Sequence, residues 1–333
     1  MKAPYILAWE VTKACNLNCV HCRASATNKT DPQELSTREG FALLDDLVNF
    51  GTKMVILSGG EPLLRKDIFE FAHHGTSLGL RMTLATNGSL ITPAVVRQIK
   101  DSGIVRVSIS LDGVSSDTHD KFRGVQGAFD QALRGVRILK QHDIAFQINT
   151  TVAAVNMAQM DKFPEFVKDL GAHAWHVFFL VPTGRGQKVE PAKIQDYQSM
   201  LENFYKVYSS AQIECKATCA PQFYRLIKEY GGDVKTKGCL AGTDFGFVSS
   251  RGSVQPCGFL DVQCGNIRNV SFQRIWTESP QLNLIRNPEK LKGKCGSCIE
   301  KTVCGGCRAR AFEVLGDMMD VDPICWYTHG QNR

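Results

Sequence analysis

Three cysteines near the start of the chain have the spacing of an iron–sulfur ligand set. Cys15, Cys19 and Cys22 lie in the run CNLNCVHC, directly after an apolar stretch at residues 6–11. Three thiolates in this C-x3-C-x2-C pattern can bind three irons of a [4Fe–4S] cluster, which leaves the fourth iron open to a chelating small molecule. On the triplet alone, zinc is the alternative, although zinc prefers four-ligand sets.

A glycine pair and a carboxylate follow the next apolar stretch. The run is Ser58-Gly59-Gly60-Glu61-Pro62. The two glycines allow a close backbone approach to a ligand, and Glu61 offers an acceptor at the carboxyl end of the predicted strand. Alone, the same run is also typical of an ordinary strand-to-loop turn.

The combination of CNLNCVHC and GGEP resembles the radical S-adenosylmethionine (radical SAM) superfamily. The resemblance implies that Cys15, Cys19 and Cys22 hold a [4Fe–4S] cluster, whose open iron is chelated by the methionine part of S-adenosylmethionine. It also implies that the strand carrying Gly59, Gly60 and Glu61 receives the amino group of this cofactor. Asn87 and Ser110, at the ends of the third and fourth predicted strands, would contact its ribose or carboxylate.

The remaining cysteines are concentrated in the last third of the chain. Cys239 and Cys257 are followed by Cys295-x2-Cys298-x5-Cys304-x2-Cys307 and by Cys325. Alone, the C-x2-C-x5-C-x2-C run also fits a zinc knuckle. The whole set resembles the SPASM extension of radical enzymes, except that the last gap is x2 instead of x3.

The SPASM resemblance implies one or two auxiliary iron–sulfur clusters. One would be held by Cys295, Cys298, Cys304 and Cys325. The other would be held by Cys239, Cys257 and Cys307, with Cys219 or Cys264 in the fourth position or with that position left open. Cys219 could instead bind a substrate iron or be a buried small hydrophobe.

Several longer runs narrow the resemblance to one branch of the superfamily. They are LAWEVTKACNLNCVHCRASA, INTTV, LVPTGRG, KATCAPQFYR and CGGCRARAFEVLGD. They resemble the branch that makes haem and haem d1 from siroheme, and most of all its haem synthases. This implies oxidative decarboxylation of two propionates of Fe-coproporphyrin III to vinyl groups, giving haem b.

An anionic porphyrin needs cationic partners and a reduced cluster needs an electron donor. Arg23, Arg185 and Arg225 lie inside the shared runs and could pair with propionate carboxylates. The donor would be a low-potential protein such as ferredoxin or flavodoxin. Three alternatives remain open: action on another tetrapyrrole of the haem d1 or didecarboxysiroheme route, action on a ribosomal peptide, and a zinc-stabilised binding protein.

Alternating apolar and helical stretches predict the scaffold that positions these residues. The predicted strands are 6–11, 54–57, 81–85, 105–110, 145–152 and 175–180. The predicted helices are 37–49, 67–77, 93–101, 128–142 and 160–170. Such alternation predicts a parallel sheet with right-handed crossovers. Six units favour an α/β fold with a partial (β/α)6 barrel, whose active groups lie at the carboxyl ends of the strands.

The chain changes character after about residue 210. All thirteen cysteines except the first three lie beyond that point. We therefore predict two domains: a barrel at residues 1–210 and a cysteine-rich iron–sulfur domain at 211–333 with a hairpin at 245–256. The later domain has little periodic apolar sequence, so bound metal would help to stabilise it.

Composition limits location and partners. The 333 residues are 43% hydrophobic with a formal charge of +6, and the N-terminus lacks the apolar segment of a secretory signal. We therefore expect a cytoplasmic protein whose clustered cysteines bind metal instead of forming disulfides. No apolar run is long enough to span a membrane, and no basic block indicates nucleic-acid binding.

Overall fold

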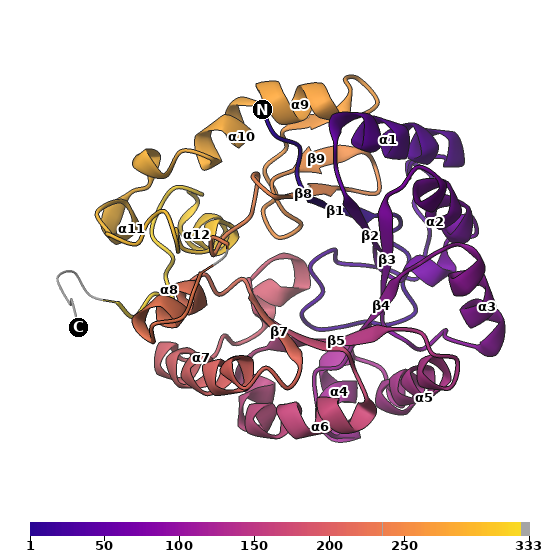
Figure 1. Ribbon diagram of the computed structural model, residues 1–333, viewed down its shortest axis with the longest axis horizontal. Helices are drawn as coiled ribbons and strands as arrows, with labels where there is room; N and C mark the ends of the chain where they lie inside the picture. The colour runs from indigo at the N-terminus through magenta and orange to yellow at the C-terminus, as the bar shows by residue number, and fades with distance from the viewer. Residues whose placement is uncertain (235, 328–333) are drawn as a thin grey trace.

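One continuous sheet forms the centre of the protein. The computed structural model describes residues 1–234 and 236–327, and its ten strands have the order β10-β9-β8-β1-β2-β3-β4-β5-β6-β7 (Figure 1). The strands are β1 (Ile6–Glu10), β2 (Met54–Ser58), β3 (Arg81–Thr86), β4 (Arg106–Ser110), β5 (Phe146–Val152), β6 (Ala174–Phe179), β7 (Glu214–Thr218), β8 (Phe245–Val248), β9 (Ser253–Gln255) and β10 (Gly265–Asn266). Neighbours from β8 to β7 are parallel, as the β/α alternation predicts, and the hairpin β8–β9 is antiparallel.

Helices surround the outer face of this curved sheet (Figure 1). They are α1 (Thr37–Phe50), α2 (Ile68–Ser77), α3 (Pro93–Asp101), α4 (Ser116–Arg123), α5 (Ala128–Gln141), α6 (Phe163–Leu170), α7 (Ile194–Ser209) and α8 (Gln222–Glu229). The C-terminal part adds four helices: α9 (Phe272–Glu278), α10 (Pro280–Ile285), α11 (Gly293–Gly296) and α12 (Arg308–Leu315). The five predicted helices are present, whereas α4, α7 and α8 were not predicted from the sequence.

The two faces of the sheet differ in chemistry. Side chains on the outer face, such as Trp9, Leu57 and Ile109, are fully buried under the helices. Trp9, for example, packs on Phe71 of α2 with ring centroids 4.7 Å apart. The inner face carries polar side chains on β4 to β7, whereas closed barrels fill their interior with branched apolar residues.

The sheet continues past residue 210, where we expected the strand–helix alternation to stop. β7 pairs with β6 in parallel, and β8 returns to pair with the other side of β1. The sequence of β7, ECKAT, alternates charged and small residues, so it lacks the apolar run that reveals a buried strand. The division of the chain at residue 210 stays a prediction.

A second, smaller core lies in the C-terminal part. It contains Leu260, Ile285, Met318 and Met319, and thiols pack on it. Within residues 1–234 and 236–327, no helix is long and apolar enough to cross a membrane.

Candidate functional site

The three N-terminal cysteines lie together on the loop after β1. Cys15 and Cys19 are 8% exposed, and the Cys22 amide donates to the Cys19 carbonyl at 3.3 Å. Burial, together with the charges of the neighbouring Cys19 and Cys22, raises the pKa of the Cys15 thiol to about 11. Three adjacent thiolates therefore need a cation, so this donor set fits a cluster bound through three irons.

A buried arginine stands beside this group. Arg123 Nη1 lies 3.7 Å from Cys19 Sγ, and Arg123 Nη2 lies 2.6 Å from the carboxylate of Asp112. Asp112 is fully buried and also accepts from the Thr151 amide at 2.7 Å. Sequence reasoning missed Arg123 because α4, which carries it, gave no recognisable signal. The arginine brings a fixed positive charge to the thiol loop.

The glycine pair packs against the same loop. A Cβ on Gly59 would lie 2.6 Å from the Thr12 carbonyl oxygen. A Cβ on Gly60 would collide with the carbonyl oxygen of Ala14. The Gly60 amide donates to Thr12 at 2.7 Å and the Glu61 amide donates to Ala14 at 2.8 Å. The two glycines therefore allow β2 to hold the backbone that leads to Cys15.

Glu61 joins the ends of two strands. Its fully buried carboxylate accepts from Thr86 Oγ1 at 2.7 Å, from the Asn87 amide at 2.8 Å and from the Leu63 amide at 3.1 Å. Burial raises the pKa of Glu61, and these donors oppose that shift. The side chain thus fixes the loop after β3 from within the protein. Its contact with a cofactor stays a prediction.

Asn87 connects that loop to the cysteines. Its Nδ2 donates to Asn16 Oδ1 at 2.9 Å, and its Oδ1 accepts from Ser89 Oγ at 2.6 Å. Asn16 in turn donates to Ser89 Oγ at 2.8 Å. Asn16 and Ser89 were not predicted, although Asn16 lies directly after Cys15. Ser110 is the last residue of β4 and is partly exposed.

The three predicted substrate arginines all have partners within the chain. Arg23 pairs with buried Glu10 at 2.9 Å. Arg225 pairs with Glu229 at 2.9 Å, and its guanidinium carbon lies 3.5 Å from the ring centre of Tyr327. Arg185 binds backbone carbonyls of the cysteine loop. Substrate contact by any of the three arginines stays a prediction.

Arg185 lies on the segment after β6 and supports the cysteine loop. Its Nε donates to the Cys19 carbonyl at 2.8 Å and its Nη1 donates to the Ala26 carbonyl at 2.7 Å. The Arg185 amide also donates to the Cys22 carbonyl at 3.0 Å. Only Nη2 is buried without a partner. Both of these side-chain hydrogen bonds therefore stabilise the loop.

Arg185→Ala is accordingly expected to loosen the cysteine loop. Each lost hydrogen bond leaves a buried carbonyl unpaired, at a cost of about 1–3 kcal/mol. Iron loss to a chelator should be several-fold faster than in the parent protein, after both are reconstituted and desalted without oxygen. Arg268→Ala, which removes an arginine from an exposed ion pair with Glu39, is the control. Equal rates of iron loss in all three proteins would contradict this role.

A second group of thiols gathers in the C-terminal part. The thiols of Cys219 and Cys307 are hydrogen-bonded, and Cys239 and Cys257 lie close enough to interact with them. The bond from Cys219 lowers the pKa of Cys307 below its usual value. The structure thus brings Cys219 to the three cysteines predicted for one auxiliary cluster. Their role as ligands stays a prediction.

Cys264, the other candidate, lies elsewhere. Its Sγ donates to the Val262 carbonyl at 3.5 Å, and its charged neighbour is Arg286.

Cys219 has an unusual backbone, with φ of +59°, a left-handed conformation that is rare outside glycine. Its surroundings therefore hold Cys219 in a strained conformation that directs its thiol to Cys307.

A third group contains Cys295, Cys304 and Cys325. Burial raises the pKa of Cys304 well above the usual value, and the charges of Cys325 and Cys295 add to the shift. Cys298 faces Arg225, with Nη1 3.9 Å from Sγ. In the part of the chain that the structure describes, no three His, Cys, Asp or Glu side chains converge on one metal ion.

Asp322 links the second and third groups. Its Oδ2 accepts from the Cys307 amide at 2.8 Å and from Gln222 Nε2 at 2.9 Å, and its own amide lies 3.5 Å from Cys295 Sγ. The carboxylate pairs with Arg310 at 3.2 Å, and both side chains are at most 3% exposed. This ion pair was not predicted from the sequence.

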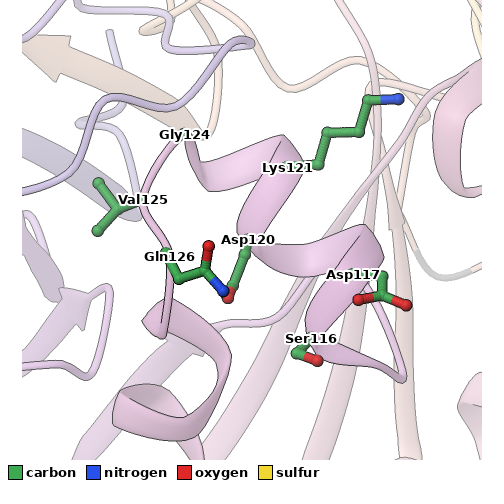
Figure 2. Close-up of a pocket in the computed structure, with 7 residues that line it drawn as sticks. All are labelled: Ser116, Asp117, Asp120, Lys121, Gly124, Val125 and Gln126. Atoms are coloured by element: carbon green, nitrogen blue, oxygen red, sulfur yellow. The ribbon is translucent and has the colours of Figure 1, made fainter.

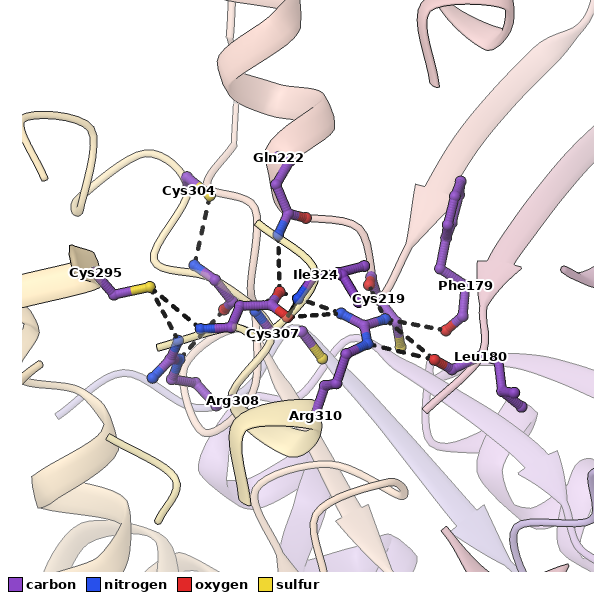
Figure 3. Close-up of polar contacts among 12 residues, drawn as sticks. Phe179, Leu180, Cys219, Gln222, Cys295, Cys304, Cys307, Arg308, Arg310 and Ile324 are labelled. Carbon is purple, nitrogen blue, oxygen red and sulfur yellow. Dashed lines mark hydrogen bonds and ion pairs between the residues drawn. The ribbon is translucent and has the colours of Figure 1, made fainter. Parts of the chain in front are cut away.

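Arg310 extends the link to the barrel. Its Nη2 donates to the carbonyls of Cys219 at 2.8 Å and Leu180 at 3.3 Å, and the latter follows β6 (Figure 3). The Asp322–Arg310 pair thus joins both thiol groups to the carboxyl end of a barrel strand.

A surface pocket lies behind the N-terminal cysteine loop, since its lining residue Val125 packs on the cluster that contains Cys15 and Cys19. It measures about 410 Å³ and is formed along α4 and the turn after it (Figure 2). Its lining residues are Ser116, Asp117, Asp120, Lys121, Gly124, Val125 and Gln126. Asp120 is already used inside the fold, since it accepts from the amides of Gly127 and Phe129. None of the predicted site residues lines this pocket.

Comparisons with known proteins identify the two parts of the chain. Residues 9–169 match the profile of the radical SAM superfamily, and residues 239–299 match SPASM, an iron–sulfur cluster-binding domain. The crystal structure of Streptococcus suis SuiB bound to S-adenosylmethionine has a TM-score of 0.79 at 18% identity, over 98% of this chain and 78% of that one. This shows the fold.

Relatives that match along nearly the whole chain identify the family more narrowly. Proteins named "AdoMet-dependent heme synthase" are 47% identical in Methanosarcina barkeri, over 99% of this chain and 98% of the relative, and 44% identical in Oleidesulfovibrio alaskensis, over 97% and 87%. A Methanosarcina barkeri protein named "Fe-coproporphyrin III synthase" is 33% identical over 97% and 88%. The chain is therefore a radical SAM enzyme with iron–sulfur clusters and S-adenosylmethionine as cofactors, and it belongs to the family of AdoMet-dependent heme synthases.

Proposed function

We propose that this enzyme converts two propionates of Fe-coproporphyrin III to vinyl groups, giving haem b. Its full-length similarity to proteins named heme synthases carries the proposal, since the similarity to a relative named for a different porphyrin product is lower. The geometry supports it, because one thiol group lies on the β1 loop and two further groups lie beyond β7.

Each conversion has a definite balance. A –CH2–CH2–COO⁻ group becomes –CH=CH2 and CO2, and it gives up one hydrogen atom and one electron. When bound, the [4Fe–4S] cluster and S-adenosylmethionine supply a 5′-deoxyadenosyl radical that takes up the hydrogen. We infer that Cys15, Cys19 and Cys22 hold this cluster, and that Gly59, Gly60, Glu61, Asn87 and Ser110 surround the cofactor.

The electron needs an acceptor, and the C-terminal thiols are the residues that could hold one. We infer that Cys219 joins Cys239, Cys257 and Cys307 as one ligand set. Cys295, Cys298, Cys304 and Cys325 would be the other. The irons of a bound cluster would supply the positive charge that several buried thiolates require.

The proposed reaction also requires an electron donor and a compartment that protects the clusters. A low-potential donor such as ferredoxin or flavodoxin would reduce the N-terminal cluster, and oxygen-sensitive clusters suit a cytoplasmic location. The barrel would occupy residues 1–210 and the iron–sulfur domain residues 211–333.

Product analysis tests the proposal. The protein would be reconstituted with iron and sulfide without oxygen and incubated with S-adenosylmethionine, dithionite and Fe-coproporphyrin III. We expect the porphyrin mass to fall in two steps, each by CO2 and two hydrogens, with one 5′-deoxyadenosine released per step. Release of 5′-deoxyadenosine from an intact porphyrin would refute this substrate, and related tetrapyrroles and then peptides would be tested in its place.

A further inference from the structure

A row of polar side chains crosses four strands on the inner face of the barrel. Ser110 on β4 is in register with Asn149 on β5, Asn149 with His176 on β6, and His176 with Lys216 on β7. Residues in register on parallel strands project to the same face of a sheet. This inner row begins at Ser110, which we place beside the cofactor, and leads away from it.

Lys216 has no counter-charge of its own. Within residues 1–234 and 236–327 its ammonium forms no hydrogen bond or ion pair, and the nearby carboxylate belongs to Glu214. Glu214 is already paired with Arg106 at 3.0 Å. Burial lowers the pKa of Lys216, which reflects the cost of holding a cation away from water. An anionic ligand would remove that cost.

His176, the neighbour of Lys216 in this row, is already engaged. Its Nδ1 lies 3.0 Å from Gln147 Nε2, and its buried Nε2 faces the carboxylate of Glu214 at 3.6 Å. Glu214 thus serves His176 and Arg106, and Lys216 is the residue of the row that lacks a partner an oxygen anion could supply.

We propose, on the basis of the function proposed above, that Lys216 binds a propionate carboxylate that the reaction leaves intact. A cation stabilises a carboxylate relative to neutral CO2, so this pairing suits an anchoring propionate and disfavours its loss. Anchoring one edge of the porphyrin on β7 would turn another edge toward Ser110 and the cofactor. The inner row thus selects which propionates react, whereas the arginines Arg23, Arg185 and Arg225 are engaged elsewhere.

Lys216→Met tests the anchor because methionine preserves the length of the side chain and removes its charge. We expect the Kd of Fe-coproporphyrin III, measured by absorbance titration of the reconstituted protein, to rise roughly 10- to 100-fold, as for one lost charged hydrogen bond. The tetramethyl ester of the same porphyrin has no carboxylate, so its Kd should be the same in both proteins. Lys216→Arg should recover most of the affinity.

Lys168→Met is the matched control, since Lys168 is exposed on α6 outside the barrel. It should leave both Kd values at the parent level, and iron content should be the same in all variants. An unchanged Kd of Fe-coproporphyrin III in Lys216→Met would overturn the anchor, and so would an equal loss for the ester. If the parent protein itself neither binds nor converts Fe-coproporphyrin III, the proposed function fails instead.

Discussion

Cys19→Ala is expected to reduce the formation of 5′-deoxyadenosine from S-adenosylmethionine to the background of the assay. Cys19 lies at the centre of the N-terminal thiol group, between Cys15, Cys22 and the guanidinium of Arg123. Its loss leaves two thiolates for a cluster that needs three. Iron in the N-terminal site should fall with activity, whereas iron in the C-terminal part should remain.

Cys215→Ala provides the control for this experiment. Cys215 lies on β7 outside the three thiol groups, and its charged neighbour is Glu214. This variant should retain parent levels of iron and of 5′-deoxyadenosine. Substantial 5′-deoxyadenosine formation by Cys19→Ala would show that the loop after β1 is not the site of cofactor cleavage.

Asp322→Ala is expected to destabilise the C-terminal part strongly. The substitution leaves the guanidinium of Arg310 buried without a counter-charge, which costs about 3–5 kcal/mol. It also removes the acceptor for the Cys307 amide and for Gln222. The protein should therefore unfold at a clearly lower temperature and retain less iron in its C-terminal part.

Two further variants separate this effect from general damage. Asp317→Ala breaks an exposed ion pair with Lys292 and should cost at most about 1 kcal/mol. Replacing Asp322 and Arg310 together with methionine removes the orphaned charge, so part of the lost thermal stability should return. Asp322→Ala with the stability of Asp317→Ala would contradict the role of the buried pair.

Regular periodicity made the barrel predictable. All six predicted strands are present, and α3 has the predicted bounds, because Thr92 and Pro93 mark its start. β7 escaped prediction because its inner face carries Glu214, Lys216 and Thr218, which interrupt any apolar run. A strand with one polar face resembles a loop in sequence unless its neighbours are known.

The cysteine motifs were predictable, but their surroundings were not. Spacing identified the sets, yet Cys219 and Cys264 remained equivalent until the fold brought Cys219 to Cys307. The residues that hold the thiol groups, Arg123 and Asp322, come from distant segments and carry no motif. Contacts between such segments depend on three-dimensional packing, which spacing in one sequence does not encode.

The sequence likewise does not show which cationic side chains are already paired within the protein. Arg185 lies in a run shared with the haem branch, which suggested contact with substrate, but its side chain binds the Cys19 and Ala26 carbonyls. Lys216 lies in another shared run, and its unpaired charge became visible only through the register of β6 and β7. Whether a cationic side chain is available to a ligand depends on all the hydrogen-bond acceptors around it in the folded protein.

The fate of one hydrogen tests the central claim most directly. Fe-coproporphyrin III carrying deuterium on the β-carbons of its propionates would be turned over without oxygen, and the 5′-deoxyadenosine would be examined by mass. We predict that each vinyl group formed is matched by one 5′-deoxyadenosine containing one deuterium. Haem b formed together with unlabelled 5′-deoxyadenosine would contradict abstraction from the propionate β-carbon and with it the proposed reaction.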